Sequence, residues 1–278
     1  MFNKVGEKMF LNELSNKRIK FIKSLKNTSS RQKVHSFLVE GFKNVTEAVN
    51  SDYSVEFIVV SDKFLKAHQG NKLLRLIVEK SIKLYAVSHD FYTKLSDTVS
   101  PQGIMAVVKE KKSFNDFFIE NGLTLALDRI GDPGNMGTII RTADAAGING
   151  LILSKGCVDV FNPKVVRSTM GSVFHLPFLS VDDMVKALNE FKKIGGTIVT
   201  THLNAHTYYY DIDYTKSTII VMGQEDDGVS EEIVDISDVL VKIPMLGRAE
   251  SLNVAIACGI ILYEAVKQRI KTSPDACK

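Results

Sequence analysis

The chain has 278 residues, of which 45% are hydrophobic and 24% are charged, and its formal net charge is +3. This length and composition allow one large domain or two ordinary ones with buried cores, and they exclude a disordered or fibrous protein. No apolar run approaches the roughly 20 residues that a membrane-spanning helix needs, and the N-terminus lacks the hydrophobic stretch of a signal peptide. We therefore expect a cytoplasmic protein with no membrane partner.

The first half of the chain has the pattern of a small α/β module, in which β-rich runs alternate with helical stretches. The expected strands are 36–40, 56–61, 83–87 and 104–108, and the expected helices lie near 41–50, 62–80 and 89–96. A turn-like SPQG at 100–103 and the charged segment 109–121 follow, so we place a domain boundary after residue 112. The predicted domains are residues 1–112 and 113–278.

The two predicted domains differ in charge. The first holds 20 Lys and Arg against 11 Asp and Glu, whereas the second holds 15 against 21. A basic domain suggests a polyanionic partner such as a nucleic acid, although a solvated basic helix face has the same composition. If 16–25 is a helix, Ile19, Ile22 and Leu25 bury one stripe and basic side chains cover the rest. The candidate phosphate contacts are Lys17, Arg18, Lys20, Lys23, Lys26 and Arg31.

The second half has the pattern of a parallel sheet covered on both faces, because near-continuous apolar strands alternate with helices. The expected strands are 123–128, 150–153, 197–201, 217–222 and 239–242, with helices near 135–147, 163–171, 182–194 and 230–236. A last helix, 251–271, has an apolar stripe that would form either core or a subunit interface, which periodicity does not distinguish. The stripe comprises Leu252, Ile256, Gly259, Ile260, Tyr263, Val266 and Ile270. The predicted fold class is α/β.

Three glycine-bearing loops follow strands of this sheet, at the edge where open parallel sheets bind ligands. The first, DRIGDPGNMG at 128–137, contains no dinucleotide fingerprint, which disfavours a nicotinamide-dependent oxidoreductase. Asn135 occupies a position where an N-cap is expected, which is one interpretation of that residue. Arg141 lies in an otherwise small and apolar helix, where it either forms a salt bridge with Asp128 or Asp144 or reaches into a cleft.

The other two loops are VMGQEDDGVS at 221–230 and KIPMLGRAESLNV at 242–254. Glycines in the second loop allow the backbone to approach a ligand closely. The carboxylates around Glu225 favour an uncharged or cationic ligand over a phosphate, and a simple acidic surface turn is the alternative. In the third loop, Ser251 or Asn253 begins the last helix, and a helix N-terminus suits an anionic group.

Other catalytic and metal-binding patterns are absent from the sequence. There is no GxSxG motif of a serine hydrolase, and we expect no bound metal. The three cysteines show no metal-binding or disulfide spacing; they are Cys157, Cys258 and Cys277. The histidines show neither HExxH nor triad spacing, and we interpret them as structural or surface residues: His35, His68, His89, His175, His202 and His206.

Taken together, the three loops resemble the motifs of a known family. DPGNMGTIIRTADAAG, MGQEDDG and IPMLGRAESLNV are similar to those of the SpoU (TrmH-like) branch of the knotted SPOUT methyltransferases, which methylate a ribose 2′-hydroxyl of ribosomal or transfer RNA. This resemblance spans about residues 123–267. Through FLVEGFKNVTEAV and LSDTVSPQGIMAVV, the first domain resembles the L30e-like substrate-binding domain found in the same family.

The resemblance implies an RNA substrate-binding domain at 1–112 and a catalytic domain at 113–278, with a deep trefoil knot formed by the segments that carry the second and third loops. It also implies a homodimer. S-adenosylmethionine would be the methyl donor, and its implied contacts are Thr201, His202, Leu203, Gly223, Ile243, Met245, Leu252 and Asn253. The implied catalytic residues are Asn135, Arg141, Glu225, Ser251 and Asn253.

The implied reaction transfers the donor's methyl group to a ribose 2′-hydroxyl, and most of its acceleration would come from positioning the two substrates. A guanidinium rarely loses its proton, so we expect Arg141 to hold the phosphate beside the target ribose and to stabilise the developing alkoxide. The two-domain layout favours ribosomal over transfer RNA. The alternatives are a tRNA 2′-O-methyltransferase and a non-catalytic RNA-binding assembly or resistance factor that retains the fold.

Overall fold

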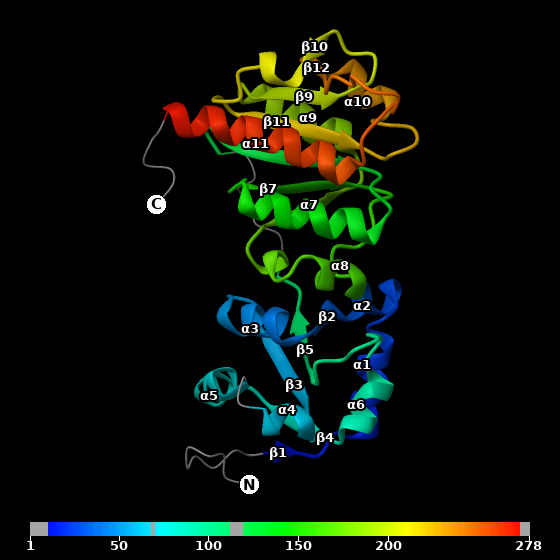
Figure 1. Cartoon of the computed structure of the whole chain (residues 1–278), viewed down its shortest axis with the longest axis vertical. Helices are drawn as coiled ribbons and strands as arrows, with labels where there is room; N and C mark the ends of the chain where they lie inside the picture. Colours follow the sequence, from blue (N-terminus) through cyan, green and yellow to red (C-terminus); the bar gives the residue numbers. More distant parts are fainter. Residues whose placement is uncertain (1–10, 68–69, 112–118, 273–278) are drawn as a thin grey trace. The chain divides into compact units, whose positions relative to one another are not determined.

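The computed structural model describes residues 11–67, 70–111 and 119–272, which belong to two compact units (Figure 1). The first unit comprises residues 1–112 with 159–174, and the second comprises residues 113–158 with 175–278. Segment 159–174, which the sequence assigns to the second domain, therefore packs with the first unit. The predicted boundary at residue 112, His68 and Cys277 lie outside the described residues.

The first unit is built on a mixed sheet in the order β1-β4-β3-β5-β2. Strands β1, β4 and β3 run parallel to one another, whereas β5 runs antiparallel to both β3 and β2. The four predicted strands are confirmed. The short β1 was not predicted, because two residues are too few to show an alternation of apolar and polar side chains. The bounds are β1 (Leu11–Asn12), β2 (Ser36–Glu40), β3 (Val55–Ser61), β4 (Leu84–Val87) and β5 (Ile104–Lys109).

Helices surround this sheet, and one comes from the distant segment 159–174. They are α1 (Asn16–Ser24), α2 (Thr28–Val34), α3 (Phe42–Asn50), α4 (Asp62–Lys66), α5 (Asn71–Glu79), α6 (His89–Leu95), α8 (Pro163–Ser168) and the 3₁₀ turn η2 (Ser172–Phe174). The predicted α1 buries Ile22, and Leu25 directly after it, in the core of the unit. The single helix predicted at 62–80 is instead two helices. Gly70 precedes the second, and the Phe64 ring packs so close that a Cβ at Gly70 would lie 2.9 Å from it.

Arg31 holds segment 159–174 in the first unit. Its side chain is fully buried, and it donates to the Asp159 carboxylate from Nε at 2.8 Å and from Nη2 at 2.6 Å. Its other donors bond the carbonyl oxygens of Leu25 and Lys26 and the hydroxyl of Thr28. All five guanidinium N–H groups are therefore used inside the unit. The prediction that Arg31 contacts RNA is wrong for this reason.

The second unit contains a parallel sheet in the order β10-β12-β9-β11-β6-β7-β8, which confirms the predicted fold class. Strands β6 and β11 are buried along their whole length, as their continuous apolar sequences predict. The sequence missed β8, which is only half-buried, and the two-residue β10. The bounds are β6 (Leu123–Asp128), β7 (Gly150–Ser154), β8 (Phe178–Val181), β9 (Thr197–Thr201), β10 (Thr207–Tyr208), β11 (Thr218–Gly223) and β12 (Val239–Lys242).

Helices cover both faces of this sheet. On one face, α9 (Met184–Lys193) and α10 (Glu231–Asp235) bury Leu188, Phe191 and Ile233 against β6, β7, β9 and β11. On the other face, α7 (Pro133–Ala145) and α11 (Val254–Thr272) lie side by side (Figure 1). A 3₁₀ turn, η3 (Tyr209–Asp211), packs near α11. None of the helices in the described part of the chain is long and apolar enough to cross a membrane.

Helix α11 is apolar on two faces. Its buried residues are Val254, Ala255, Cys258, Ile261, Leu262 and Ala265. The stripe identified in the sequence lies on a different face, where Ile256 is 56% exposed and Tyr263 is 50% exposed. Of the two alternatives that periodicity left open, core and subunit interface, the stripe is therefore not core within this chain.

Replacing Arg31 with alanine leaves the buried side of the Asp159 carboxylate without its partner. We expect the free energy of unfolding to fall by about 3–5 kcal/mol, the usual loss when one member of a buried ion pair is removed. Urea denaturation of Arg31→Ala measures this loss. Lys17→Ala, an exposed lysine of the same unit, is the control and should change stability by no more than about 0.5 kcal/mol. Equal stability of the two variants would contradict the structural role of Arg31.

Candidate active site

The three predicted loops leave the sheet at the carboxyl ends of β6, β11 and β12. A cavity of about 570 Å³ lies among the segments that follow β9, β11 and β12. It is lined by seven of the eight predicted donor contacts: Thr201, His202, Leu203, Gly223, Ile243, Met245 and Leu252. The eighth, Asn253, follows Leu252 directly but is not part of the lining. The residues that the family resemblance implies as donor contacts therefore line one cavity, although they come from segments that lie far apart along the chain.

The second loop closes tightly on itself. The backbone N–H of Gly228 donates to the carbonyl oxygen of Gln224 at 3.1 Å, and a Cβ at Gly223 would lie 2.1 Å from the Gly228 carbonyl carbon. Only glycine fits at Gly223 for this reason. Gly228 has φ +69°, a conformation that favours glycine as well. The turn presents three consecutive acidic residues, of which Glu225 is the first.

Asn135, Glu225 and Asn253 bring the three loops together by hydrogen bonds. Glu225 Oε1 accepts from Asn135 Nδ2 at 3.0 Å and from Asn253 Nδ2 at 2.6 Å. Asn253 Nδ2 also donates to Asn135 Oδ1 at 3.0 Å. Three residues from different parts of the chain therefore form one polar cluster, which we call the amide–carboxylate cluster.

Helix ends orient two members of this cluster. Asn253 Oδ1 accepts from the backbone N–H of Ala255 at 3.0 Å at the start of α11, so its amide nitrogen faces Glu225. The N-cap of α7 is Asp132, whose side chain accepts from the backbone N–H of Asn135. The interpretation of Asn135 as an N-cap is therefore wrong. Its side chain is free for the cluster because the residue lies inside the first turn.

Ser251 and Arg141 do not join the amide–carboxylate cluster. Ser251 is exposed and lines the 570 Å³ cavity. Arg141 is exposed on α7 and makes no side-chain hydrogen bond or ion pair with any residue that the structure describes. It lies six residues after Asn135, a rise of about 9 Å along the helix.

The salt bridges considered for Arg141 do not form. Asp144 pairs with His175 Nδ1 at 2.9 Å, and Asp128 pairs with Arg129 at 3.1 Å. The guanidinium of Arg141 is therefore available to a group outside the described chain.

A second cavity, of about 530 Å³, adjoins the first. Four residues line both cavities: Gln224, Glu225, Asp226 and Val254. The rest of its lining comes from the loops after β6 and β7 and from the first turn of α7, and includes Asn135, Arg129 and Lys155. Sequence reasoning missed the last two. The available signal was their position, since each directly follows a strand of the parallel sheet.

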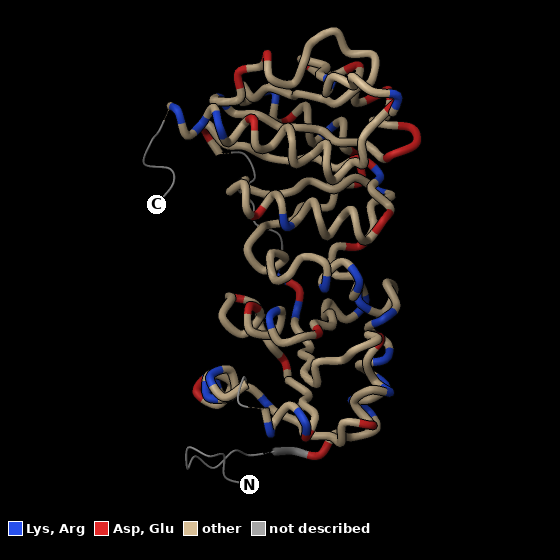
Figure 2. The backbone as a smooth tube through the Cα atoms, viewed as in Figure 1, with Lys and Arg blue, Asp and Glu red and all other residues tan. Residues whose placement is uncertain are grey.

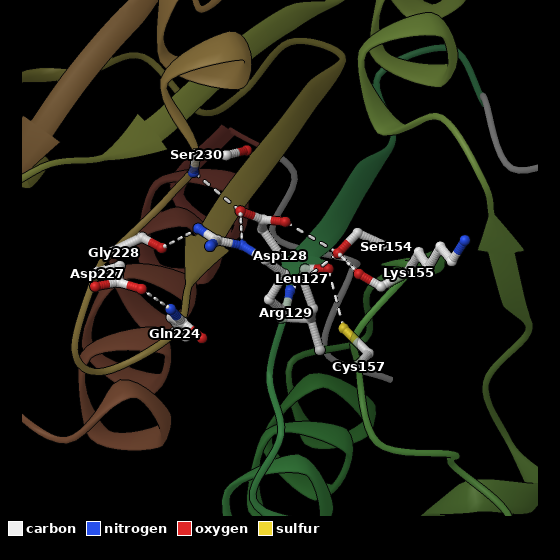
Figure 3. Close-up of polar contacts among 10 residues, drawn as sticks. All are labelled: Leu127, Asp128, Arg129, Ser154, Lys155, Cys157, Gln224, Asp227, Gly228 and Ser230. Carbon is white, nitrogen blue, oxygen red and sulfur yellow. Dashed lines mark hydrogen bonds and ion pairs between the residues drawn. The ribbon is translucent and has the colours of Figure 1, made fainter.

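The described cysteines are not nucleophiles here. Burial raises the pKa of the Cys157 thiol, which donates to the Leu127 carbonyl oxygen at 3.3 Å (Figure 3). Burial also raises the pKa of Cys258 to about 12. Both stay protonated near neutral pH. Among residues 11–67, 70–111 and 119–272, no three His, Cys, Asp or Glu side chains gather in a way that could hold a metal ion.

In the first unit, Lys and Arg follow one another along α1 (Figure 2). Lys17, Lys20 and Lys23 are exposed and form no hydrogen bond or ion pair with other side chains that the structure describes. The other predicted RNA contacts on this segment are partly engaged. The Arg18 guanidinium lies 4.8 Å from the centroid of the Tyr85 ring, and Lys26 pairs with Asp97 at 2.6 Å.

Comparisons with known proteins match both units. The SpoU rRNA Methylase family matches residues 122–263, and the MRM3-like substrate binding domain matches residues 16–106. The chain is 34% identical over 250 residues to the 23S rRNA (guanosine(2553)-2′-O)-methyltransferase RlmP of Bacillus subtilis, covering 89% of this chain and 95% of that protein. It is also 34% identical to the 23S rRNA (uridine(2479)-2′-O)-methyltransferase of Streptomyces viridochromogenes, covering 88% of each.

Solved structures agree with this match. The SpoU methyltransferase AviRb of Streptomyces viridochromogenes, crystallised in complex with the cofactor AdoMet, superimposes with a TM-score of 0.82 at 32% identity. The match covers 92% of this chain and all of that one. With its three motif loops, its parallel sheet and both family matches, the chain belongs to the SpoU rRNA methylase family.

Proposed function

We propose that the protein transfers a methyl group from S-adenosylmethionine to a ribose 2′-hydroxyl of structured RNA, with 23S-type ribosomal RNA as the favoured substrate. The observation that carries this proposal is the pair of adjoining cavities with the amide–carboxylate cluster beside their common wall. Two curated relatives named for methylation of 23S rRNA at a 2′-oxygen support the choice of substrate.

The first cavity suits the methyl donor. Its volume lies in the range of small-molecule sites, and Ile243, Met245 and Leu252 provide apolar contacts for an adenine ring. At Gly223 a side chain would collide with the second loop, so the bare backbone forms that wall. Glu225 gives the wall a negative charge, which suits a sulfonium. Bound there, the donor supplies an electrophilic methyl group, and AviRb crystallised with AdoMet supports this assignment.

The chain's own residues supply positioning. Asn135 and Asn253 hold the Glu225 carboxylate in one orientation at the wall between the cavities, so that it can accept a hydrogen bond from a ribose hydroxyl. Ser251, on the donor side, offers a second hydroxyl contact. Arg141 would bind the adjacent phosphate and stabilise negative charge on the attacking oxygen, because a guanidinium is a cation with several N–H donors.

In a homodimer, Arg141 of one copy would act at the site of the other. Arg141 is exposed on α7, which packs beside α11, and α11 exposes Ile256 and Tyr263 on its second apolar face. An exposed apolar helix face of this kind is typical of a subunit interface. We infer that two copies pair through this face, and that each copy's Arg141 acts at the site of its partner.

The sheet order supports the implied trefoil knot. Strand β11 lies between β9 and β6, and the chain then returns past β9 to form β12. The segments that follow β11 and β12 are the second and third loops. Action on ribosomal RNA would place the protein in the cytoplasm.

Methyl transfer from labelled S-adenosylmethionine tests the function directly. Ribosomal RNA, transfer RNA and DNA of matched length serve as substrates, and alkaline digestion of the product should leave a resistant 2′-O-methylated dinucleotide from ribosomal RNA. Label in transfer RNA alone would favour the transfer RNA alternative. RNA binding with no incorporation into any RNA would show a non-catalytic RNA-binding factor.

For Arg141→Ala, we expect methyl transfer to fall by roughly 10²–10³-fold, because one preorganised charge at the reacting oxygen is removed. Donor affinity should stay unchanged, since Arg141 does not line the donor cavity. Single-turnover transfer and calorimetry with S-adenosylmethionine measure the two effects. A drop in donor affinity would refute the assigned role.

Tyr263→Asp places a charge on the exposed face of α11. We expect it to convert the homodimer to a monomer and to abolish methyl transfer, because each site then lacks the partner's Arg141. Sedimentation equilibrium gives the oligomeric state, and Lys186→Gln on α9 is a surface control. A fully active monomer would disprove the shared site.

Reversing the charge of Lys17, Lys20 and Lys23 together should weaken RNA binding. The slope of log affinity against log salt should become shallower by about 0.7–0.9 for each phosphate that these lysines no longer neutralise. Donor binding should not change, because these lysines belong to the first unit. Titrations at several salt concentrations test this, and an unaltered slope would identify the lysines as a solvated surface.

A further inference from the structure

We propose that the 530 Å³ cavity is the site for the sugar–phosphate of the acceptor nucleotide, and that Arg129 is its phosphate-binding residue. This inference rests on the proposed function and names the RNA contact of the same site. It assigns a role to Arg129, which is not among the predicted catalytic residues, donor contacts or RNA contacts.

The position of the cavity supports an acceptor site. A ribose oxygen must come within about 3 Å of the methyl carbon, so donor and acceptor sites must share a wall. The 530 Å³ cavity shares Gln224, Glu225 and Asp226 with the donor cavity. Its lining also combines Asp132, Glu225 and Asp226 with the basic Arg129 and Lys155. A nucleotide's sugar–phosphate matches this mixture, because its hydroxyls donate to carboxylates and its phosphate accepts from cations.

Arg129 is held in place by the buried Asp128, which is 3% exposed (Figure 3). Asp128 Oδ2 accepts from Arg129 Nε at 3.1 Å and from the backbone N–H of Ser230 at 2.9 Å. Its Oδ1 accepts from Ser154 Oγ at 3.0 Å. Arg129 Nη2 reaches further, to the carbonyl oxygen of Gly228 at 3.2 Å. The guanidinium is therefore fixed between the first and second loops.

The backbone of Arg129 is strained. Its φ is +58°, in the left-handed region, which glycine or asparagine adopts at lower cost than arginine does. Gly156 leaves room for the side chain, because a Cβ there would lie 3.2 Å from Arg129 Cγ. Because this position suits glycine, a long cationic side chain here indicates that the side chain has a function of its own.

Arg129 keeps donors available for a ligand. Two of its five N–H groups are used by Asp128 and Gly228, and no described residue accepts from the other three. Its side chain is 35% exposed and lines the cavity. A planar guanidinium with free N–H groups matches the geometry of a phosphate. Lys155 points away from Arg129 in Figure 3, so within this cavity we assign the phosphate contact to Arg129 and not to Lys155.

The competing explanation is that Arg129 only neutralises Asp128. We choose asparagine as the replacement for Arg129, because it tolerates the left-handed backbone but carries no charge. For Arg129→Asn we expect RNA affinity to fall roughly tenfold or more. The slope of log affinity against log salt should become shallower by about 0.7–0.9, the change for one phosphate contact, and donor affinity should not change. Binding is measured without the donor, and Lys186→Gln is the matched control.

The double variant Asp128→Asn with Arg129→Asn decides the question, because it removes both charges. Under our proposal its stability returns towards that of the wild type, while RNA affinity stays as low as in the single variant. Recovery of RNA affinity together with stability would overturn the proposal, and so would an unchanged salt slope in Arg129→Asn. Because the readout is RNA binding, it is independent of methyl incorporation by the wild type, on which the proposed function depends.

Discussion

The hydrogen bonds that Glu225 accepts from Asn135 and Asn253 are the interaction on which the site depends, because the first and third loops meet at this carboxylate. Each partner lies at a helix N-terminus. The Asn253 amide oxygen caps α11, which leaves the nitrogen for Glu225, and Asp132 caps α7, which leaves the Asn135 side chain free. Two helix ends therefore determine the direction in which a carboxylate points between two cavities.

Much of this arrangement could be predicted from the sequence, and the reason is topological. In a parallel sheet the carboxyl ends of the strands lie at one edge, so the loops after β6, β11 and β12 share that edge whatever their separation along the chain. The continuous apolar runs of β6 and β11 made these strands easy to identify. The family resemblance added which residues of the loops are expected to contact the donor, and seven of the eight line the 570 Å³ cavity.

Other features could not be predicted, because they depend on contacts that local patterns do not record. Arg31 looked like one more basic residue, but its partner Asp159 is 128 residues away, in a segment whose sequence gives no sign that it packs with the first unit. Helix α11 is apolar on two faces, so periodicity alone identified one stripe and could not say which face meets the sheet. The short β10 and the half-buried β8 lack the apolar alternation that marks a strand.

The left-handed backbone of Arg129 could not be predicted from the sequence either. The contacts of this residue connect the two cavities. Asp128 bonds the backbone of Ser230 and the guanidinium of Arg129, and Arg129 bonds the carbonyl oxygen of Gly228. Both ends of this chain of bonds fall on the second loop, which forms a wall of the donor cavity. A phosphate drawn to Arg129 would pull on the same guanidinium that holds Gly228. Because positioning supplies most of the acceleration in a reaction between two bound substrates, a residue that binds the acceptor and also holds the donor's wall aligns both with one side chain.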